Sequence, residues 1–276
     1  MCDILDRAFL AEGIEYYSAI AFENTRVINE RLLAKAPFSP RAAIIFLVPY
    51  YSGKAENLSV YSASKDYHLF LKELNSKIIS ALSRAYPTAR FLGYGDHSPI
   101  DERHAALISG LGIIGKNGLL INEKYGSFVF ISDILTDLEP SKLGASDPKP
   151  ISSCKACGRC LQACPTGILC GKSEICLSAL TQKKGELSEE EKRIILSSGS
   201  VWGCDECQLS CPYNRDPVLT PIEFFKEDRT PHLTLDILDS MSEEEFSERA
   251  YAWRGRKTIR RNLLLFESEK SNKCDP

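Results

Sequence analysis

The sequence predicts a protein of the α/β or α+β class, in which an N-terminal mixed-sheet domain precedes a cysteine-rich module and a short helical tail. Three observations predict this order. Residues 1–146 combine apolar runs typical of buried strands with stretches of helical periodicity. Nine of the eleven cysteines fall within residues 154–211. Helix-start signals then recur in residues 218–276.

The composition is that of an ordinary globular protein. Of the 276 residues, 43% are hydrophobic and 26% are charged, which argues against disorder and against a membrane bundle. The longest apolar run, residues 42–48, is far shorter than the ~18 residues of a membrane span, and the N-terminus lacks the pattern of a secretory signal. We therefore expect a cytoplasmic protein with no membrane partner. The net charge of −3 means that nucleic acid could be bound only by a local basic patch.

The first domain has one strand signal and three helix signals before residue 110. Residues 42–48 form a continuous apolar run closed by Pro49, typical of a strand buried on both faces. Helical stretches are expected at about residues 27–35, from residue 66 to 85, and after Pro99. In the second of these, the apolar residues recur at helical spacing, as Leu71, Leu74, Ile78 and Leu82.

The end of the first domain resembles a β-hairpin. Residues 119–121 and 128–131 are apolar, and they flank a turn-like segment at 122–126. Together with the buried strand at 42–48, this pattern predicts a mixed sheet.

Turn formers and capping signals set the remaining boundaries. Residues 143–150 are rich in turn formers, which predicts a first domain of residues 1–146, a cysteine module of 147–217 and a helical segment of 218–276. Capping boxes open one helix in the module and one in the tail, at Ser188 with Glu191 and at Ser242 with Glu245.

A basic segment lies in the tail. Residues 254–261 carry five basic side chains, namely Arg254, Arg256, Lys257, Arg260 and Arg261. The segment is either an exposed helix face or a patch that contacts phosphates.

The cysteines follow the spacing of bacterial ferredoxins. Residues 154–165 read C-x2-C-x2-C-x3-C-P, in which three thiolates converge on one cluster and the cysteine before proline reaches a second one. Four thiols this close together favour iron–sulfur over zinc, whose sites pair ligands across a long loop. Residues 204–212 read C-x2-C-x3-C-P, with the same ending but one ligand fewer.

Two 4Fe-4S clusters need eight thiolates, so one more cysteine is required. The crossover of each cysteine before proline assigns one cluster to Cys154, Cys157, Cys160 and Cys211. The other cluster is then held by Cys164, Cys204, Cys207 and either Cys170 or Cys176. The terminal Cys2 and Cys274 are weaker candidates.

Chemistry upstream of the cysteines is indicated by a group of titratable residues. Three of the four histidines lie in residues 66–104, together with several carboxylates that are candidate proton donors. These residues are His68, His97, His104, Asp66, Asp96, Asp101 and Glu102. A glycine-rich run at 110–117 is either a turn that a bulky ligand can approach or a tight helix-to-strand connection. It lacks the hydroxyl residue and the preceding strand of a nucleotide-binding loop.

Several segments in order resemble the epoxyqueuosine reductase family, whose members use cobalamin and iron–sulfur clusters to complete queuosine in tRNA. The matching segments are residues 61–68, 96–104, 110–117, 126–137, 154–167, 176–181 and 202–214. The resemblance covers most of residues 40–265.

The resemblance implies a base-off cobalamin held by the first domain, with Asp96 as the proton donor and Cys176, not Cys170, as the eighth cluster ligand. It implies a tRNA substrate and an external electron donor of the flavodoxin or ferredoxin type. The cobalamin contacts carried over are Tyr67, His68, His97, Ser98, Gly112, Gly115, Lys116 and Asn117.

One agreement, one departure and two alternatives accompany the resemblance. The chain has no D-x-H-x-x-G signature of His-ligated corrinoid proteins, in agreement with base-off binding, and it ends before the helical-repeat domain of many members, as a short form would. One alternative is an electron-transfer or corrinoid-reactivating protein; the other is a reductase of a different small electrophile, since the scaffold also resembles reductive dehalogenases. The large upstream α/β region favours an enzyme.

Overall fold

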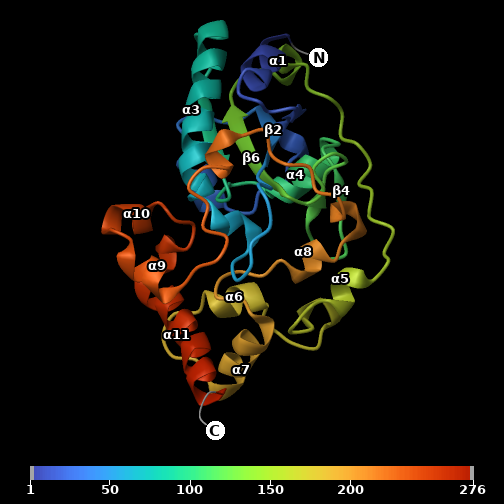
Figure 1. Ribbon diagram of the computed structural model, residues 1–276. Coiled ribbons are helices and arrows are strands. Elements are labelled where there is room, and N and C mark those ends of the chain that lie inside the picture. The colour runs from blue at the N-terminus through green and yellow to red at the C-terminus, as the bar shows by residue number, and fades with distance from the viewer. Residues whose placement is uncertain (1–2, 274–276) are drawn as a thin grey trace. The chain divides into compact units, whose positions relative to one another are not determined.

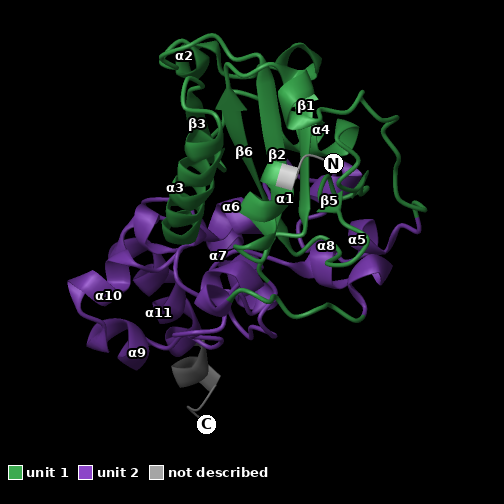
Figure 2. Ribbon diagram, turned by 90° about the horizontal axis from the view of Figure 1, so that it is seen from above, with its two compact units in different colours: residues 1–50, 68–156, 216–222 green, residues 51–67, 157–215, 223–276 purple. Residues whose placement is uncertain are grey.

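The computed structural model describes residues 3–273 (Figure 1). The chain divides into two compact units, coloured separately in Figure 2. Unit 1 comprises Met1–Tyr50, His68–Ala156 and Asp216–Ile222, and unit 2 comprises Tyr51–Tyr67, Cys157–Arg215 and Glu223–Pro276. In the described part of the chain, no helix is both long and apolar enough to cross a bilayer.

Unit 1 is built on a four-stranded sheet in the order β1–β2–β6–β3. The strands are β1 (Tyr16–Ala21), β2 (Ala42–Pro49), β3 (Phe91–Gly95) and β6 (Val129–Thr136). Every pairing in this sheet is antiparallel, so the expectation of a mixed sheet is wrong. The apolar run of β2 reflects burial on both faces, which antiparallel neighbours also permit when helices cover the sheet on both sides.

Helices cover the two faces of this sheet. On one face, α4 (Glu102–Ile108) packs its alanines and leucine against Ile45 and Leu47. On the other face lie α1 (Asp3–Leu10) and α3 (Tyr67–Ala85), and the ring centroid of Phe9 is 5.1 Å from that of Phe46. Gly95 lets α3 approach β3, since a Cβ there would lie 2.6 Å from Leu71.

The expectation of a β-hairpin at residues 119–131 is also wrong. Strand β5 (Leu120–Ile121) pairs with β4 (Ile113–Ile114), whereas β6 pairs with β2 and β3. Residues 122–126 do form a turn, closed by a bridge between Asn122 and Gly126. This turn passes the chain from the small sheet to the large one, and a local pattern does not reveal that change of partner.

Local signals elsewhere are confirmed. Helix α3 occupies the expected 66–85 region, with its four periodic apolar residues buried. Both capping boxes are present, at the starts of α7 (Glu189–Ser198) and α10 (Glu243–Ser247). The helix expected at 27–35 is shorter, α2 (Glu30–Leu33), because Val27 instead forms a bridge with Ile100.

Unit 2 is helical, with two small cores. Its remaining helices are α5 (Arg159–Gln162), α6 (Leu177–Thr181), α8 (Glu206–Leu209), α9 (Leu235–Ser240) and α11 (Arg256–Lys273). One core surrounds Trp202 and Tyr251, and the other surrounds Leu180 and Ile195. The buried Asn262 of α11 ties both regions together by donating to the carbonyls of Thr181 and Val201.

Each unit is made of three separate segments of the chain, and the limits of these segments differ from the expected domain limits at residues 146 and 217. Residues 51–67 belong with the C-terminal helices, because Leu58 forms a bridge with Trp202 and the amide of Val60 donates to Asp205 at 2.5 Å. The tail after residue 222 is likewise part of unit 2 and not a separate segment. Such pairings between distant segments leave no mark in local composition.

Candidate functional site

The loop after β3 carries an exposed aspartate next to a histidine. Asp96 has a φ of +62°, a left-handed conformation that is uncommon for residues other than glycine, and its side chain is 63% exposed. The Nε2 atom of His68, from α3, lies 3.6 Å from Asp96 Oδ2. The structure therefore brings together two of the predicted site residues.

One buried and one half-buried carboxyl group lie near this loop. Asp133, on β6, is fully buried, and in the described part of the chain neither of its carboxylate oxygens has a hydrogen-bond partner. It pairs in register with Ile45, so both side chains lie on the face that α4 covers. Glu102 is the first residue of that helix, and its buried Oε1 is unpartnered as well.

Burial and mutual charge raise the pKa of both groups. Burial raises the pKa of Glu102 to about 8, helped by the charges of Asp133 and Asp96 and opposed by the backbone amide of Asp96. Burial also raises the pKa of Asp133 to about 7, although the Ser98 hydroxyl partly offsets it. Asp133 was not predicted as a site residue; its only sequence signal is a charge inside an apolar strand.

The other residues of the loop and of α4 differ in their surroundings. His97 is exposed, and Ser98 is buried with its hydroxyl accepting from the amide of Ile100. The Nδ1 atom of His104 is buried without a partner in the described part of the chain. Tyr67 is buried at the start of α3, in the segment assigned to unit 2.

The glycine-rich run forms a tight connection from α4 to β4. A Cβ at Gly112 would lie 2.5 Å from the backbone oxygen of Ile121, and one at Gly115 would clash with the side-chain oxygen of Asn117. Lys116, which follows Gly115, is exposed. Packing within unit 1 therefore accounts for the two glycines, which matches the second of the two interpretations of this run.

Four cysteines of unit 2 lie close enough to affect one another. Burial raises the pKa of the Cys207 thiol to about 12, with further increases from Cys204, Cys176 and Cys164. Burial raises the pKa of Cys204 to about 11, and Cys176 adds to it. Cys170 is exposed, and its thiol donates to the Leu161 carbonyl instead.

Cys164 has an environment suited to a thiolate. Burial alone would raise its pKa, but the backbone amides of Leu169, Gly167 and Thr166 and the Thr166 hydroxyl lower the pKa overall. Hydrogen bonds of this kind tune cluster-bound sulfur. In the described residues, no three Cys, His, Asp or Glu side chains converge as ligands of a single metal ion.

The first of the remaining motif cysteines, Cys154, lies near the end of the second segment of unit 1. The amide of Cys154 donates to the Ile114 carbonyl, which ties this residue to β4. Cys157 and Cys211 are at least partly exposed, whereas Cys160 in α5 is buried. Helices α5 and α8 are in contact, which brings the two cysteine runs side by side (Figure 1). Cys2 and Cys274 lie outside the described residues.

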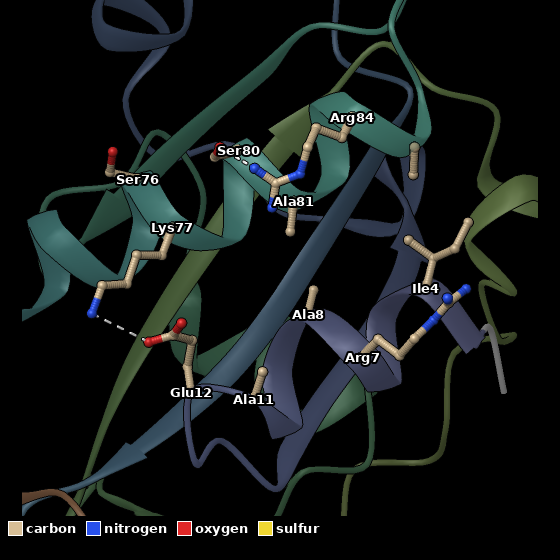
Figure 3. A pocket seen from close by; sticks show the side chains of 11 residues that line it. Ile4, Arg7, Ala8, Ala11, Glu12, Ser76, Lys77, Ser80, Ala81 and Arg84 are labelled. Atoms are coloured by element: carbon tan, nitrogen blue, oxygen red, sulfur yellow. Dashed lines mark hydrogen bonds and ion pairs between the residues drawn. The ribbon is translucent and has the colours of Figure 1, made fainter.

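A groove in unit 1 lies apart from these residues. It has a volume of about 840 Å³ and runs between α1 and α3 (Figure 3). Alanines form its floor, and Lys77 and Glu12 pair across it at 3.5 Å. None of its lining residues is a predicted site residue.

The basic segment at 254–261 is mostly engaged within unit 2. Arg256 donates to the carbonyls of Leu238, Met241 and Ser242. Arg260 forms a bidentate pair with Asp239, and Arg261 donates to the carbonyls of Lys183 and Gly185. These three guanidinium groups are bonded within the protein. Most of the positive charge that a phosphate-binding patch would need is therefore already engaged.

Comparison with known proteins defines first a class and then a family. Residues 153–214 match the family model described as "4Fe-4S double cluster binding domain", which makes the chain an iron–sulfur protein. An epoxyqueuosine reductase of Listeria monocytogenes is 31% identical over 94% of this chain and 72% of its own length. Another, from Lactococcus garvieae, is 30% identical over 94% of this chain and 77% of its own length. The chain belongs to the epoxyqueuosine reductase family.

Solved structures agree on the fold. The epoxyqueuosine reductase of Streptococcus thermophilus aligns with a TM-score of 0.79 at 24% identity, over 96% of this chain and 80% of that one. A second structure, of epoxyqueuosine reductase with an epoxyqueuosine-modified tRNA-Tyr stem loop, aligns with a TM-score of 0.77 at 23% identity over the same shares.

Proposed function

We propose that this protein reduces epoxyqueuosine in tRNA to queuosine, using two 4Fe-4S clusters and a base-off cobalamin. The observation that carries the proposal is the match to epoxyqueuosine reductases over 94% of the chain. Two further features support it. Unit 2 has a group of mutually interacting thiols, and unit 1 has an acid site that a simple electron carrier does not need.

The donor set fits iron–sulfur clusters. In this proposal, Cys164, Cys176, Cys204 and Cys207 hold one cluster, which is supported by the effect of the first three thiols on the pKa of Cys207 and of Cys176 on that of Cys204. The other cluster is held by Cys154, Cys157, Cys160 and Cys211, an assignment that rests on the ferredoxin-type spacing. An external flavodoxin or ferredoxin would supply the electrons.

The residues expected at the cobalamin offer a proton-donating face. Asp96, His68 and His97 are exposed, and together they form a set suited to supplying protons at a redox centre. When bound, the cobalamin would supply the strongly reducing chemistry that opening the epoxide requires. The remaining carried-over contacts, Tyr67, Ser98, Gly112, Gly115, Lys116 and Asn117, belong to the proposal as well.

Asp96 is the proton donor in this proposal. The leaving oxygen of an opened epoxide is strongly basic, so a positioned acid stabilises it by protonation. Two features of Asp96 support this role. Its side chain faces solvent, and its backbone amide forms a hydrogen bond with the Glu102 carboxyl. His68, at 3.6 Å, orients the Asp96 carboxyl.

The test is an anaerobic reaction with reconstituted protein, cobalamin, a strong reductant and a tRNA stem loop that carries epoxyqueuosine. Queuosine is measured by mass spectrometry of the digested nucleosides, with a control that lacks cobalamin. We expect cobalamin-dependent conversion that is lost in Asp96→Asn and kept in Asp147→Asn, which changes an exposed aspartate outside the site. Cluster reduction without conversion would instead favour an electron-transfer protein or a reductase of another electrophile.

A further inference from the structure

Two carboxyl groups of unit 1, those of Asp133 and Glu102, have no role in the proposed reaction. Their positions are unfavourable for the free energy of the folded protein when they are ionised. Asp133 is fully buried, and in the described part of the chain its two carboxylate oxygens lack hydrogen-bond partners. Glu102 has one buried, unpartnered oxygen. An ionised carboxylate without partners is strongly disfavoured inside a protein, so groups in such positions keep their protons to a higher pH than they would in water.

Glu102 is linked to the exposed acid on one side and to the buried one on the other. The backbone amide of Asp96 donates toward the Glu102 carboxyl, and the charges of both Asp96 and Asp133 act on it. Asp96 is itself the loop residue with the left-handed φ of +62°. A proton on Glu102 is therefore held next to the residue proposed to donate one.

The other charged groups near Glu102 are few. Asp101, the N-cap of α4, adds a further negative charge and is itself paired with Arg26 at 3.7 Å. On the far side of Asp96, His68 of α3 faces its carboxylate. Strand β2, which packs against α4, contains no ionisable side chain. The surroundings of Glu102 are thus net negative, which favours its protonated form.

The proposed reaction requires two protons at one oxygen. Converting an epoxide to an alkene breaks both carbon–oxygen bonds, consumes two electrons and two protons, and releases the oxygen as water. The electrons come from the external donor through the clusters. Asp96 holds one proton, so after the first transfer it is a carboxylate and must be reprotonated before it can act again.

We propose that Glu102 is a positioning residue that stores the second proton and returns it to Asp96, with Asp133 keeping Glu102 protonated until then. The inference rests on the proposed function. In the step itself, the Glu102 carboxyl loses its proton and the Asp96 carboxylate gains it, with no change in electron count. Water reprotonates Glu102 after turnover. A Glu102 pKa of about 8 is consistent with a proton that is stored at neutral pH yet can be transferred.

The first experiment needs neither cofactor nor substrate. Infrared difference spectra of the protein are recorded as a function of pH, and the C=O band of protonated carboxyls is followed. We expect a carboxyl that titrates near pH 8 in the native protein and is missing from Glu102→Gln. The matched control is Glu30→Gln, which changes an exposed glutamate at the same position, directly after the N-cap, in α2. No difference between the native protein and Glu102→Gln would overturn the proposal.

The second experiment measures turnover. Glu102→Gln keeps the shape of the side chain but cannot pass on a proton, so we expect kcat to fall by about 10- to 100-fold, with KM and iron content unchanged. The fall of kcat at alkaline pH should also disappear. Unchanged kcat and pH profile would refute the role of Glu102. If the native protein converts no epoxyqueuosine, the proposed function fails, while the infrared band still decides whether Glu102 stores a proton.

Discussion

Replacing Asp133 by asparagine should stabilise unit 1 at alkaline pH and not at acidic pH. Asp133 lies in the centre of β6, fully buried, between Ile45 of β2 and Tyr94 of β3. Burial raises its pKa to about 7, so the folded state binds its proton more tightly than the unfolded state does. A raised acid pKa favours folding at low pH, and this advantage is lost as the pH rises through the folded value.

The magnitude follows from that difference in pKa. A rise from the ordinary 3.8 to about 7 corresponds to ~4 kcal/mol, as an upper limit, between acidic and alkaline pH. Asparagine has no charge to bury, so the variant does not carry this pH-dependent cost. Its amide is as unpartnered as the acid, which costs ~1–3 kcal/mol at every pH. The pH-dependent part of the difference is therefore the diagnostic quantity.

Chemical denaturation of the two proteins at pH 4.5 and pH 8.5 measures this quantity. We expect the free energy of unfolding of Asp133→Asn, relative to the native protein, to rise by ~2–4 kcal/mol across that interval. Asp137→Asn is the control, and its free energy of unfolding relative to the native protein should not change across that interval. Burial alone would raise the pKa of Asp137, but Arg90 holds it below its ordinary value. The stabilising contribution of its carboxylate is therefore the same at pH 4.5 and pH 8.5 and is lost only in stronger acid. A parallel pH response in both variants would refute the reasoning.

Three further predictions concern the clusters, the proton donor and the basic segment. Cys176→Ala should lose about half of the bound iron, and Cys170→Ala should keep it all, as measured by iron analysis after anaerobic reconstitution; the reverse would make Cys170 the ligand. Asp96→Asn should keep its iron and lower kcat by about 10²–10⁴, and near-normal kcat would assign the proton to another group. Arg261→Ala should destabilise unit 2 by ~1–3 kcal/mol in a denaturant titration, because it donates to two carbonyls, whereas exposed Lys257→Ala should not.

The elements that the sequence predicts well are those determined by neighbouring residues. The burial of β2 follows from an unbroken apolar run, and α3 follows from apolar residues at helical spacing. The helix starts at Ser188 and Ser242 follow from side chains that cap amides three residues away. Each of these signals is complete within a few turns of chain, so no distant partner can change it.

Strand pairing depends instead on distant segments. Both apolar stretches of the expected hairpin form strands, yet β5 pairs with β4 and β6 pairs with β2 and β3. The short strand β3, Phe91–Gly95, includes two glycines and gives no strand signal, although it forms an edge of the large sheet. It becomes a strand because α3 packs closely over Gly93 and Gly95.

The candidate site was predictable only where the residues lie close in sequence. Asp96, His97 and Glu102 fall in one short segment, and a resemblance in that segment indicates the first of them. Asp133 is far along the chain and reaches the site through the register of β6. The gathering of Cys164 and Cys176 with Cys204 and Cys207 likewise depends on folding of unit 2, although their spacing indicated their chemistry.

The cost of Asp133 is itself an argument about function. An apolar residue of similar size at this position would pack against Ile45 and α4 without an unpartnered charge, so stability alone favours replacing the acid. Glu102 occupies the first position of α4, where an exposed acid would interact favourably with the helix dipole, yet it is half-buried, with Oε1 fully buried, and the charge of another acid acts on it. The Ser98 hydroxyl and the Asp96 backbone amide offset only part of the burial of Asp133 and Glu102, and the pKa of each acid remains raised. Strain and unsatisfied polar groups of this kind persist mainly where they serve chemistry, which is the physical basis for assigning the pair to proton supply.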